Sequence, residues 1–168
     1  SFLPFNTPTG GSLFVATDVG IYDATSSGVA GTAETSCTDG DWQSVSFINT
    51  AGPWLVAVNG VDYMKNFDGT TWTDVTGAST PAITGVDTRD LINLCMHKRR
   101  LWFVEANSMD LWYLAVDAIG GAATRFPVGP IFPRGGYAVA CASWTIDGGN
   151  GVDDLFVIVT SEGELAVY

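Results

Sequence analysis

Short segments in which apolar and polar residues alternate follow one another along most of the chain, and this period-2 pattern is typical of β-strands. The clearest example begins at residue 44, and the run after it is continuously apolar, as in a strand buried on both faces. Asn59-Gly60 and Asp68-Gly69 are strong turn signals between strands. Together they predict one antiparallel meander with strands at 44–49, 54–58, 62–67 and 71–76.

A short apolar phrase recurs four times and sets a long-range period. The copies are Leu13-Phe-Val-Ala, Leu55-Val-Ala-Val, Leu101-Trp-Phe-Val and Leu155-Phe-Val-Ile. Their starts lie 42, 46 and 54 residues apart, which matches four-stranded propeller repeats and is too long for ankyrin or leucine-rich units. After each copy comes a turn and a second apolar stretch that contains tyrosine. The repeat therefore predicts one meander of strands around each copy.

The other three units follow this plan less completely. For the third unit we expect strands at 91–96, 101–105, 109–116 and 124–126. For the fourth unit we expect three, at 137–146, 155–160 and 164–168. For the first unit we expect only the middle strands, 13–17 and 21–24, because prolines and Asn6 break the segment before them. No helix is expected, since Gly120-Gly121 interrupts the only candidate, 115–123.

The predicted fold is all-β: a single partial β-propeller fragment, 1–168, of about three to four blades of four-stranded antiparallel meanders. The approximate blades are 1–40, 41–80, 81–130 and 131–168, with the two inner ones complete and the two outer ones cut. Closed propellers need roughly four to eight blades. We therefore expect a mature product or an excised fragment that completes itself with more chain or with other copies.

Composition and charge limit the function. No apolar run approaches the roughly 18 residues that span a bilayer, so no membrane segment is expected. The net charge of −11, from 18 acidic and 7 basic residues, disfavours nucleic-acid binding and suits a surface that DNA passes without specific binding. The three cysteines are far apart, which disfavours a disulfide framework and favours a reduced, intracellular site of assembly.

The cluster His97-Lys-Arg-Arg100 contains three of the seven basic residues and the only histidine. Its place between two predicted strands favours a solvated turn; a salt-bridged subunit contact and a nucleic-acid contact are the alternatives. Cys95 and His97 share one face of a predicted strand, but two ligands do not make a zinc site.

The acidic segment Asp147–Asp154 has the residue types of a calcium loop, but not the spacing of an EF-hand, and a polar turn is favoured. Two carboxylate pairs, Asp153 with Asp154 and Glu162 with Glu164, are candidates for glycoside hydrolysis. Neighbouring strand residues point to opposite faces, so we expect solvated edges instead. No hydrolase triad, nucleophile elbow or phosphate loop is present. We predict that the chain is not an enzyme. We expect no catalytic, cofactor-binding or metal-binding residues in it, and no cofactor.

Two aromatic features fit the fold better than a binding site. Trp54 and Trp102 begin apolar strands and Trp72 closes a hairpin, so core packing is the default interpretation. The segment Asp68-Gly-Thr-Thr-Trp72 resembles, imperfectly, the Asp-box hairpin of sialidase-type propellers, which is structural in that family. The arginine triad and the Tyr-Glu pair of a sialidase cannot be assembled from this chain.

The C-terminal half resembles a family of virion proteins. The resemblance is carried by several segments: Arg100-Leu-Trp-Phe-Val-Glu-Ala-Asn107, Leu111-Trp-Tyr-Leu114, Ala118–Pro130, Gly135-Gly-Tyr137, Ser143–Asp154 and Ser161–Tyr168. They are similar to the tail tubular or nozzle (DNA-stabilisation) proteins of short-tailed bacteriophages and related prophages. The likeness covers about residues 90–168, and the first half matches only in its repeat pattern.

The resemblance implies a structural protein of the phage tail nozzle, located in the virion and assembled in the bacterial cytoplasm. Other copies of the chain in a ring, typically sixfold, and the phage adaptor and tail proteins would be its partners. Such a ring forms part of the DNA exit channel and helps to retain packaged DNA. The alternative is a carbohydrate-binding or glycan-hydrolysing propeller module on a phage or bacterial surface. It requires exposed tryptophans and clustered carboxylates in one groove.

Overall fold

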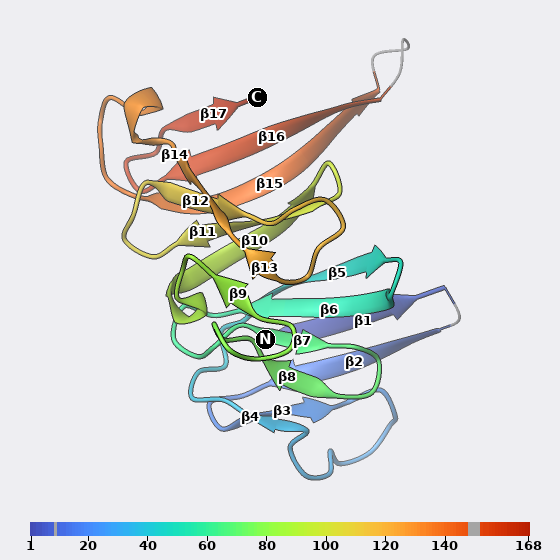
Figure 1. The fold of residues 1–168 in the computed structure, drawn as a ribbon. Coiled ribbons are helices and arrows are strands. Elements are labelled where there is room, and N and C mark those ends of the chain that lie inside the picture. The colour runs from blue at the N-terminus through green and yellow to red at the C-terminus, as the bar shows by residue number, and fades with distance from the viewer. Residues whose placement is uncertain (9, 148–151) are drawn as a thin grey trace.

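The computed structural model describes residues 1–8, 10–147 and 152–168, and these form an all-β molecule of several antiparallel sheets, none of which closes into a barrel (Figure 1). The first sheet contains β1 (Phe2–Thr7), β2 (Gly10–Ala16), β3 (Gly20–Asp23) and β4 (Thr35–Ser36). The second contains β5 (Gln43–Asn49), β6 (Gly52–Val58), β7 (Lys65–Phe67) and β8 (Trp72–Asp74). The third contains β10 (Leu91–His97), β11 (Arg100–Glu105), β12 (Asp110–Tyr113) and β14 (Thr124–Pro127). The last contains β15 (Ala138–Asp147), β16 (Val152–Thr160) and β17 (Leu165–Val167).

Each of these four sheets is a meander, because strands that follow one another within it are hydrogen-bonded neighbours. The described part of the chain also contains two short 3₁₀ turns, η1 (Thr88–Asp90) and η2 (Gly129–Ile131). A small parallel pair, β9 (Ile83–Thr84) and β13 (Gly121–Ala122), lies beside the second and third sheets. No helix in the described residues has the length and hydropathy to cross a bilayer.

The sheets are stacked in chain order, and each consecutive pair encloses its own apolar core. Between the first two sheets, Leu3, Phe14 and Phe67 belong to one cluster. Between the second and third, Phe47, Val56 and Phe103 belong to another, which we call the central core. A third cluster joins the third and last sheets. The inner sheets are therefore apolar on both faces, which explains why their second strands are continuous apolar runs.

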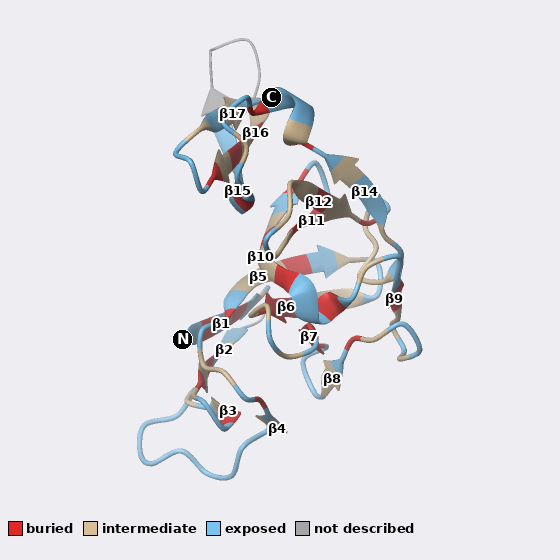
Figure 2. Ribbon diagram, turned by 90° about the vertical axis from the view of Figure 1, so that its left-hand side faces the viewer, coloured by how far each residue is buried: buried red, intermediate tan, exposed pale blue. Residues whose placement is uncertain are grey.

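The first strands of the sheets lie together on one side of the stack. β1 contacts β5 and β6, β5 contacts β10, and β10 contacts β15. The later strands, such as β8 and β14, lie on the opposite side (Figure 2). Consecutive sheets therefore pack face to face, with their first strands converging.

The repeated apolar phrase marks the second strand of every sheet, as the sequence predicts. Leu13, Leu55, Leu101 and Leu155 lie in β2, β6, β11 and β16. In the second sheet all four predicted strands are present, although β7 begins at Lys65 instead of residue 62. The delay arises because Asn59 Oδ1 accepts hydrogen bonds from the backbone N–H groups of Val61 and Asp62, which makes a longer loop in place of a two-residue hairpin.

The first sheet corrects the expectation that this unit lacks an outer strand. β1 pairs with β2 along its whole length, from Phe2 opposite Val15 to Thr7 opposite Gly10. Pro4 is tolerated because β1 is the edge strand of its sheet, where a missing N–H breaks no ladder. The first sheet thus has four strands, like the two inner sheets. Only the last sheet has three in the described residues.

Candidate functional site

The basic cluster is a hairpin turn, as predicted. β10 ends at His97 and β11 begins at Arg100, and the two residues between them have positive φ angles, 47° at Lys98 and 60° at Arg99. The Arg99 guanidinium donates from Nε to Oδ1 of Asp117 at 2.9 Å. The Arg100 side chain lies over the Tyr113 ring at 5.4 Å. Two of the cations are thus engaged within their own sheet, which leaves Lys98 for contact with solvent or a partner.

Ion pairs engage other basic residues as well. Of the seven Lys and Arg residues, four form ion pairs with carboxylates: Lys65 with Asp74, Arg89 with Asp87, Arg99 with Asp117 and Arg125 with Asp110. The excess of carboxylates therefore sets the sign of the surface field, and such a field repels phosphate backbones.

The acidic candidates do not assemble into a site in the described residues. Residues 148–151 of the Asp147–Asp154 segment and the Asp153 side chain lie outside them, so the calcium-loop hypothesis stays a prediction. Asp154 accepts a hydrogen bond from the Thr145 hydroxyl at 2.7 Å. Glu164 accepts one from the backbone N–H of Arg134 at 3.1 Å. Within the part of the chain that the structure describes, no three His, Cys, Asp or Glu side chains are grouped closely enough to hold a metal ion.

The tryptophans are mainly packing residues. Trp102 lies against Tyr113, Phe126 and Phe156, with ring centroids 4.7, 5.5 and 4.7 Å away. Trp72 follows the predicted Asp68 hairpin, in which Asp68 Oδ1 accepts from the N–H groups of Thr70 and Thr71. Both observations confirm the structural interpretation. Trp144 is the exception, because 56 % of it is exposed.

Two hollows in the described part of the chain do not resemble glycan or catalytic sites. One, of about 400 Å³, is lined by the single loop 23–31, and its carboxylate is Asp23. Hydrogen bonds from Thr25 lower the pKa of Asp23. A second hollow of similar volume lies between β1, β2 and the second sheet, and none of its described lining residues is titratable at neutral pH. Neither hollow combines tryptophan with clustered carboxylates, as the glycan alternative requires.

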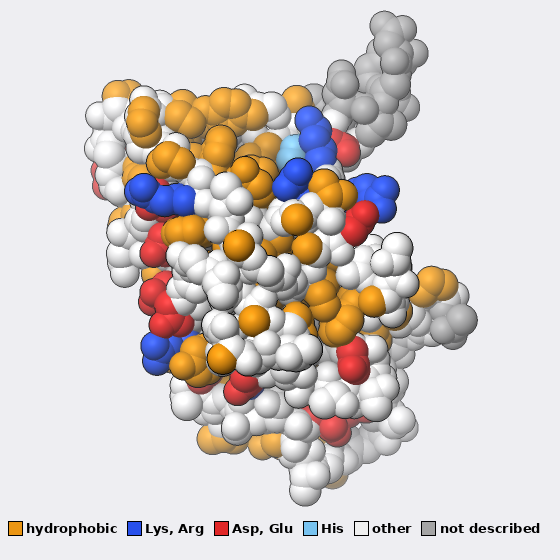
Figure 3. Space-filling model, viewed as in Figure 1, with side chains coloured by type: hydrophobic (Ala, Val, Ile, Leu, Met, Phe, Trp, Pro, Cys, Tyr) orange, Lys and Arg blue, Asp and Glu red, His pale blue; other side chains and the backbone are white. Residues whose placement is uncertain are grey.

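The outward face of the last sheet is the most unusual surface. Strand pairing places Trp144 opposite Leu155, Val157 opposite Val167, and Val159 opposite Leu165. With Ala140 and Ala142 these residues form a set of eight, all apolar, that we call the last end face: Ala140, Ala142, Trp144, Leu155, Val157, Val159, Leu165 and Val167. Trp144, Leu165 and Val167 are 56, 61 and 44 % exposed. Hydrophobic side chains gather along this end of the molecule (Figure 3).

The opposite end of the stack carries a similar surface. On the outward side of the first sheet, Phe2 pairs with Val15, Pro4 with Leu13, and Val15 with Tyr22. We call these five residues the first end face; Phe2 is 73 % exposed and Leu13 36 %. An antiparallel sheet that faces water normally presents polar side chains. Both end faces therefore have the composition of faces that another layer covers.

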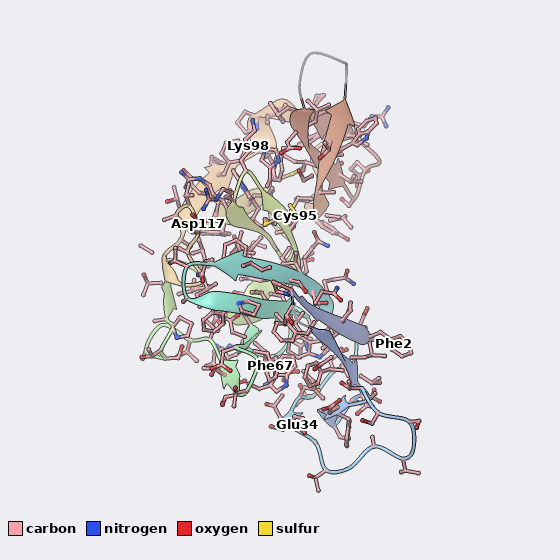
Figure 4. The ribbon with its side chains drawn as sticks, turned by 90° about the vertical axis from the view of Figure 1, so that its right-hand side faces the viewer. Phe2, Glu34, Phe67, Cys95, Lys98 and Asp117 are labelled. Carbon is pink, nitrogen blue, oxygen red and sulfur yellow. The ribbon has the colours of Figure 1, made fainter. Side chains whose placement is uncertain are left out.

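The structure also brings together two side chains that the sequence left apart. Cys95 on β10 and Cys141 on β15 have their sulfur atoms 3.3 Å from each other (Cys95 is labelled in Figure 4). The predicted shared face of Cys95 and His97 is confirmed, because Met96 between them is exposed and His97 Nδ1 lies 3.1 Å from the Ser143 hydroxyl on β15. Cys37 is buried elsewhere, where its thiol contacts the carbonyl of Thr17.

The environment of His97 leads to a prediction about pH. Burial lowers its pKa from the ordinary value of 6.5, and Lys98 lowers it further while Asp154 opposes the shift. The unfolded chain therefore binds this proton more readily, and stability is lost as the pH falls through 6.5 toward the folded-state value. We expect the free energy of unfolding to fall more steeply between about pH 7 and 5 in the wild type than in His97→Gln. Urea titrations across this pH range measure the free energy of unfolding. Parallel pH profiles of the wild type and His97→Gln would contradict the prediction.

Comparison of the chain with protein-family models, with curated proteins and with solved structures finds no match in any of the three. The case for a function therefore rests on the molecule's own geometry and on the sequence resemblance given above.

Proposed function

We propose that this chain is a structural segment of a phage tail nozzle, built as an open part of a β-propeller that is completed by other copies of itself. The observation that carries the proposal is the pair of bare apolar end faces. Stacking of four sheets in chain order with converging first strands supports the interpretation of these sheets as propeller blades. An open array of this kind leaves one uncovered face at each end.

A second copy is the occupant that we propose for the end faces. The last end face is the one that would meet a following sheet, and the first end face is the one that would meet a preceding sheet. Contact between the last end face of one copy and the first end face of the next repeats the packing already found within the chain. This head-to-tail contact is heterologous, and such contacts close into rings when the rotation allows.

The acidic surface supports passage of DNA through a nozzle ring built from such propellers. Carboxylates outnumber cations, and four of the cations are already paired. Packaged DNA would release no counterions on contact with a wall of this charge, so binding to the wall would not be favoured. Stacked sheets joined by apolar cores would supply the stiffness that a pressurised channel needs. No group in the described residues suggests a catalytic role beside this mechanical one.

Cryo-electron microscopy of the full-length protein, together with the particles released by a phage-producing culture, tests the proposal. We expect a ring of this chain at the DNA exit vertex, below the portal. Gold-labelled antibody against the chain should mark the same vertex. A protein that is absent from purified particles, or that binds duplex DNA tightly at physiological salt, would contradict the proposal. A hit on a glycan array with tryptophan-fluorescence quenching would favour the surface glycan module instead.

A further inference from the structure

The contact between β10 and β15 is fixed at three alternate residues of β10, which meet two residues of β15. The Asn93 side-chain oxygen accepts a hydrogen bond from the backbone N–H of Cys141 at 3.0 Å. Next along β10, the sulfur atoms of Cys95 and Cys141 are 3.3 Å apart. Beyond them, His97 Nδ1 and the Ser143 hydroxyl are 3.1 Å apart. The two thiols are thus held against each other by a polar contact on either side.

We propose that Cys95 and Cys141 are a redox modification site, and that they form an intrachain disulfide with a small-molecule disulfide as the oxidant. A disulfide bond is about 2.05 Å long, so the sulfurs must approach by a little over 1 Å, a movement within the reach of side-chain rotation. The bond joins the third sheet to the last sheet. Because the last sheet packs on only one side, this link would hold the terminal layer of the stack in place.

The order of the two chemical steps follows from exposure. The Cys95 side chain is partly exposed and Cys141 is 5 % exposed, so the Cys95 thiolate attacks the external disulfide first. This attack forms a mixed disulfide and releases one external thiolate. Cys141 then gives up its proton and attacks the Cys95 sulfur, which displaces the second external thiol. In sum, two protein thiols lose two electrons and two protons, and one external disulfide is reduced to two thiols.

The surroundings of Cys141 make the second step depend on the first. Its contact with Cys95 and its burial raise the pKa of the Cys141 thiol. Cys141 is therefore unreactive toward reagents in solution, and Cys95 is the sulfur within its reach. Cys37 has no such partner among the described cysteines, and its burial and the nearby Asp62 raise its pKa as well. Cys37 thus provides an internal control for non-specific oxidation.

The test is to equilibrate the reduced full chain in buffers of increasing oxidised-to-reduced glutathione ratio, and then to quench and unfold it in acid denaturant, alkylate the remaining thiols of the unfolded chain and measure the mass. We expect a species that has lost two hydrogen atoms and carries one alkyl group, at Cys37. Digestion should yield a single linked peptide pair that contains Cys95 and Cys141. The linked chain should melt about 5–15 °C higher than the reduced chain, since the bond closes a long loop.

Three variants complete the experiment. Cys37→Ser should form the same link, whereas Cys95→Ser should remain unmodified at Cys141. Cys141→Ala should stop at the mixed disulfide between Cys95 and glutathione, and a cooperative thermal transition of this variant shows that the chain folds without the second thiol. A denatured sample of the same chain shows which glutathione ratios are able to oxidise its thiols. If Cys95 and Cys141 of the folded chain remain reduced, and are therefore alkylated, at all of these ratios, the proposal is wrong. Persistence of the mixed disulfide at Cys95 in the wild type would also overturn it.

Discussion

Replacing Phe103 with alanine should abolish most of the folded population under mild denaturing conditions. Phe103 lies on β11, is fully buried and belongs to the central core, which joins the second and third sheets. Deleting a buried phenylalanine costs about 3–5 kcal/mol, as lost transfer free energy plus a cavity. Since the free energy of unfolding of small domains is about 5–15 kcal/mol, this loss is a large part of it.

Urea denaturation followed by tryptophan fluorescence measures the loss as a change in midpoint at constant slope. Phe2→Ala is a matched control, because the same side chain is deleted where it is 73 % exposed. At a protein concentration that keeps the chain monomeric, Phe2→Ala should change the free energy of unfolding by no more than about 0.5 kcal/mol. Equal effects of the two substitutions would show that the central core does not hold the sheets together.

The second large effect concerns a buried lysine. Lys65 on β7 is almost fully buried, and its ammonium group donates to Asp74 on β8 and to the Thr35 hydroxyl on β4 of the first sheet. Asp74→Ala would leave this cation without its carboxylate. We expect the free energy of unfolding to fall by about 1–3 kcal/mol, less than for a fully buried pair because the Asp74 side chain is 54 % exposed.

A double variant separates the charge from the packing. Lys65→Met has a similar length and carries no charge, so Asp74→Ala should cost much less in the Lys65→Met background. Arg99→Ala serves as a comparison, because the Arg99 side chain is 72 % exposed and its ion pair with Asp117 should contribute about 0–1 kcal/mol. If Asp74→Ala lowers the free energy of unfolding equally in both backgrounds, the unpaired lysine is not the cause of the loss.

Local patterns predicted the strands and turns whose causes lie within a few residues. The apolar phrases at Leu55 and Leu101 form second strands because a sheet covered on both faces needs a continuous apolar run. Asp68 and the Lys98–Arg99 pair form turns because their hydrogen bonds and backbone angles are local. Phe47 lies in the alternating segment 44–49 and is buried in β5.

Features that depend on distant partners could not be predicted in this way. Pro4 argued against a strand, yet β1 forms because it pairs along its whole length with β2. The two-residue strands β9 and β13 pair in parallel across a long interval, and neither has a period that could be recognised. The contact between Cys95 and Cys141 arises because two sheets stack, and their spacing along the sequence carries no sign of it. Similarly, the run at Leu155 predicted a strand but not that one of its faces is bare.

Sedimentation velocity of the full chain over a range of concentrations tests the central claim, which is that copies join through their end faces. We expect association that strengthens with concentration, and also with salt, because the net charge of −11 makes the copies repel one another. Trp144→Glu and Leu165→Lys on the last end face should each leave a monomer with unchanged melting, whereas Val29→Glu, at a fully exposed loop position, should associate like the wild type. A chain that remains monomeric throughout, or that associates equally well with both end-face substitutions, would contradict it.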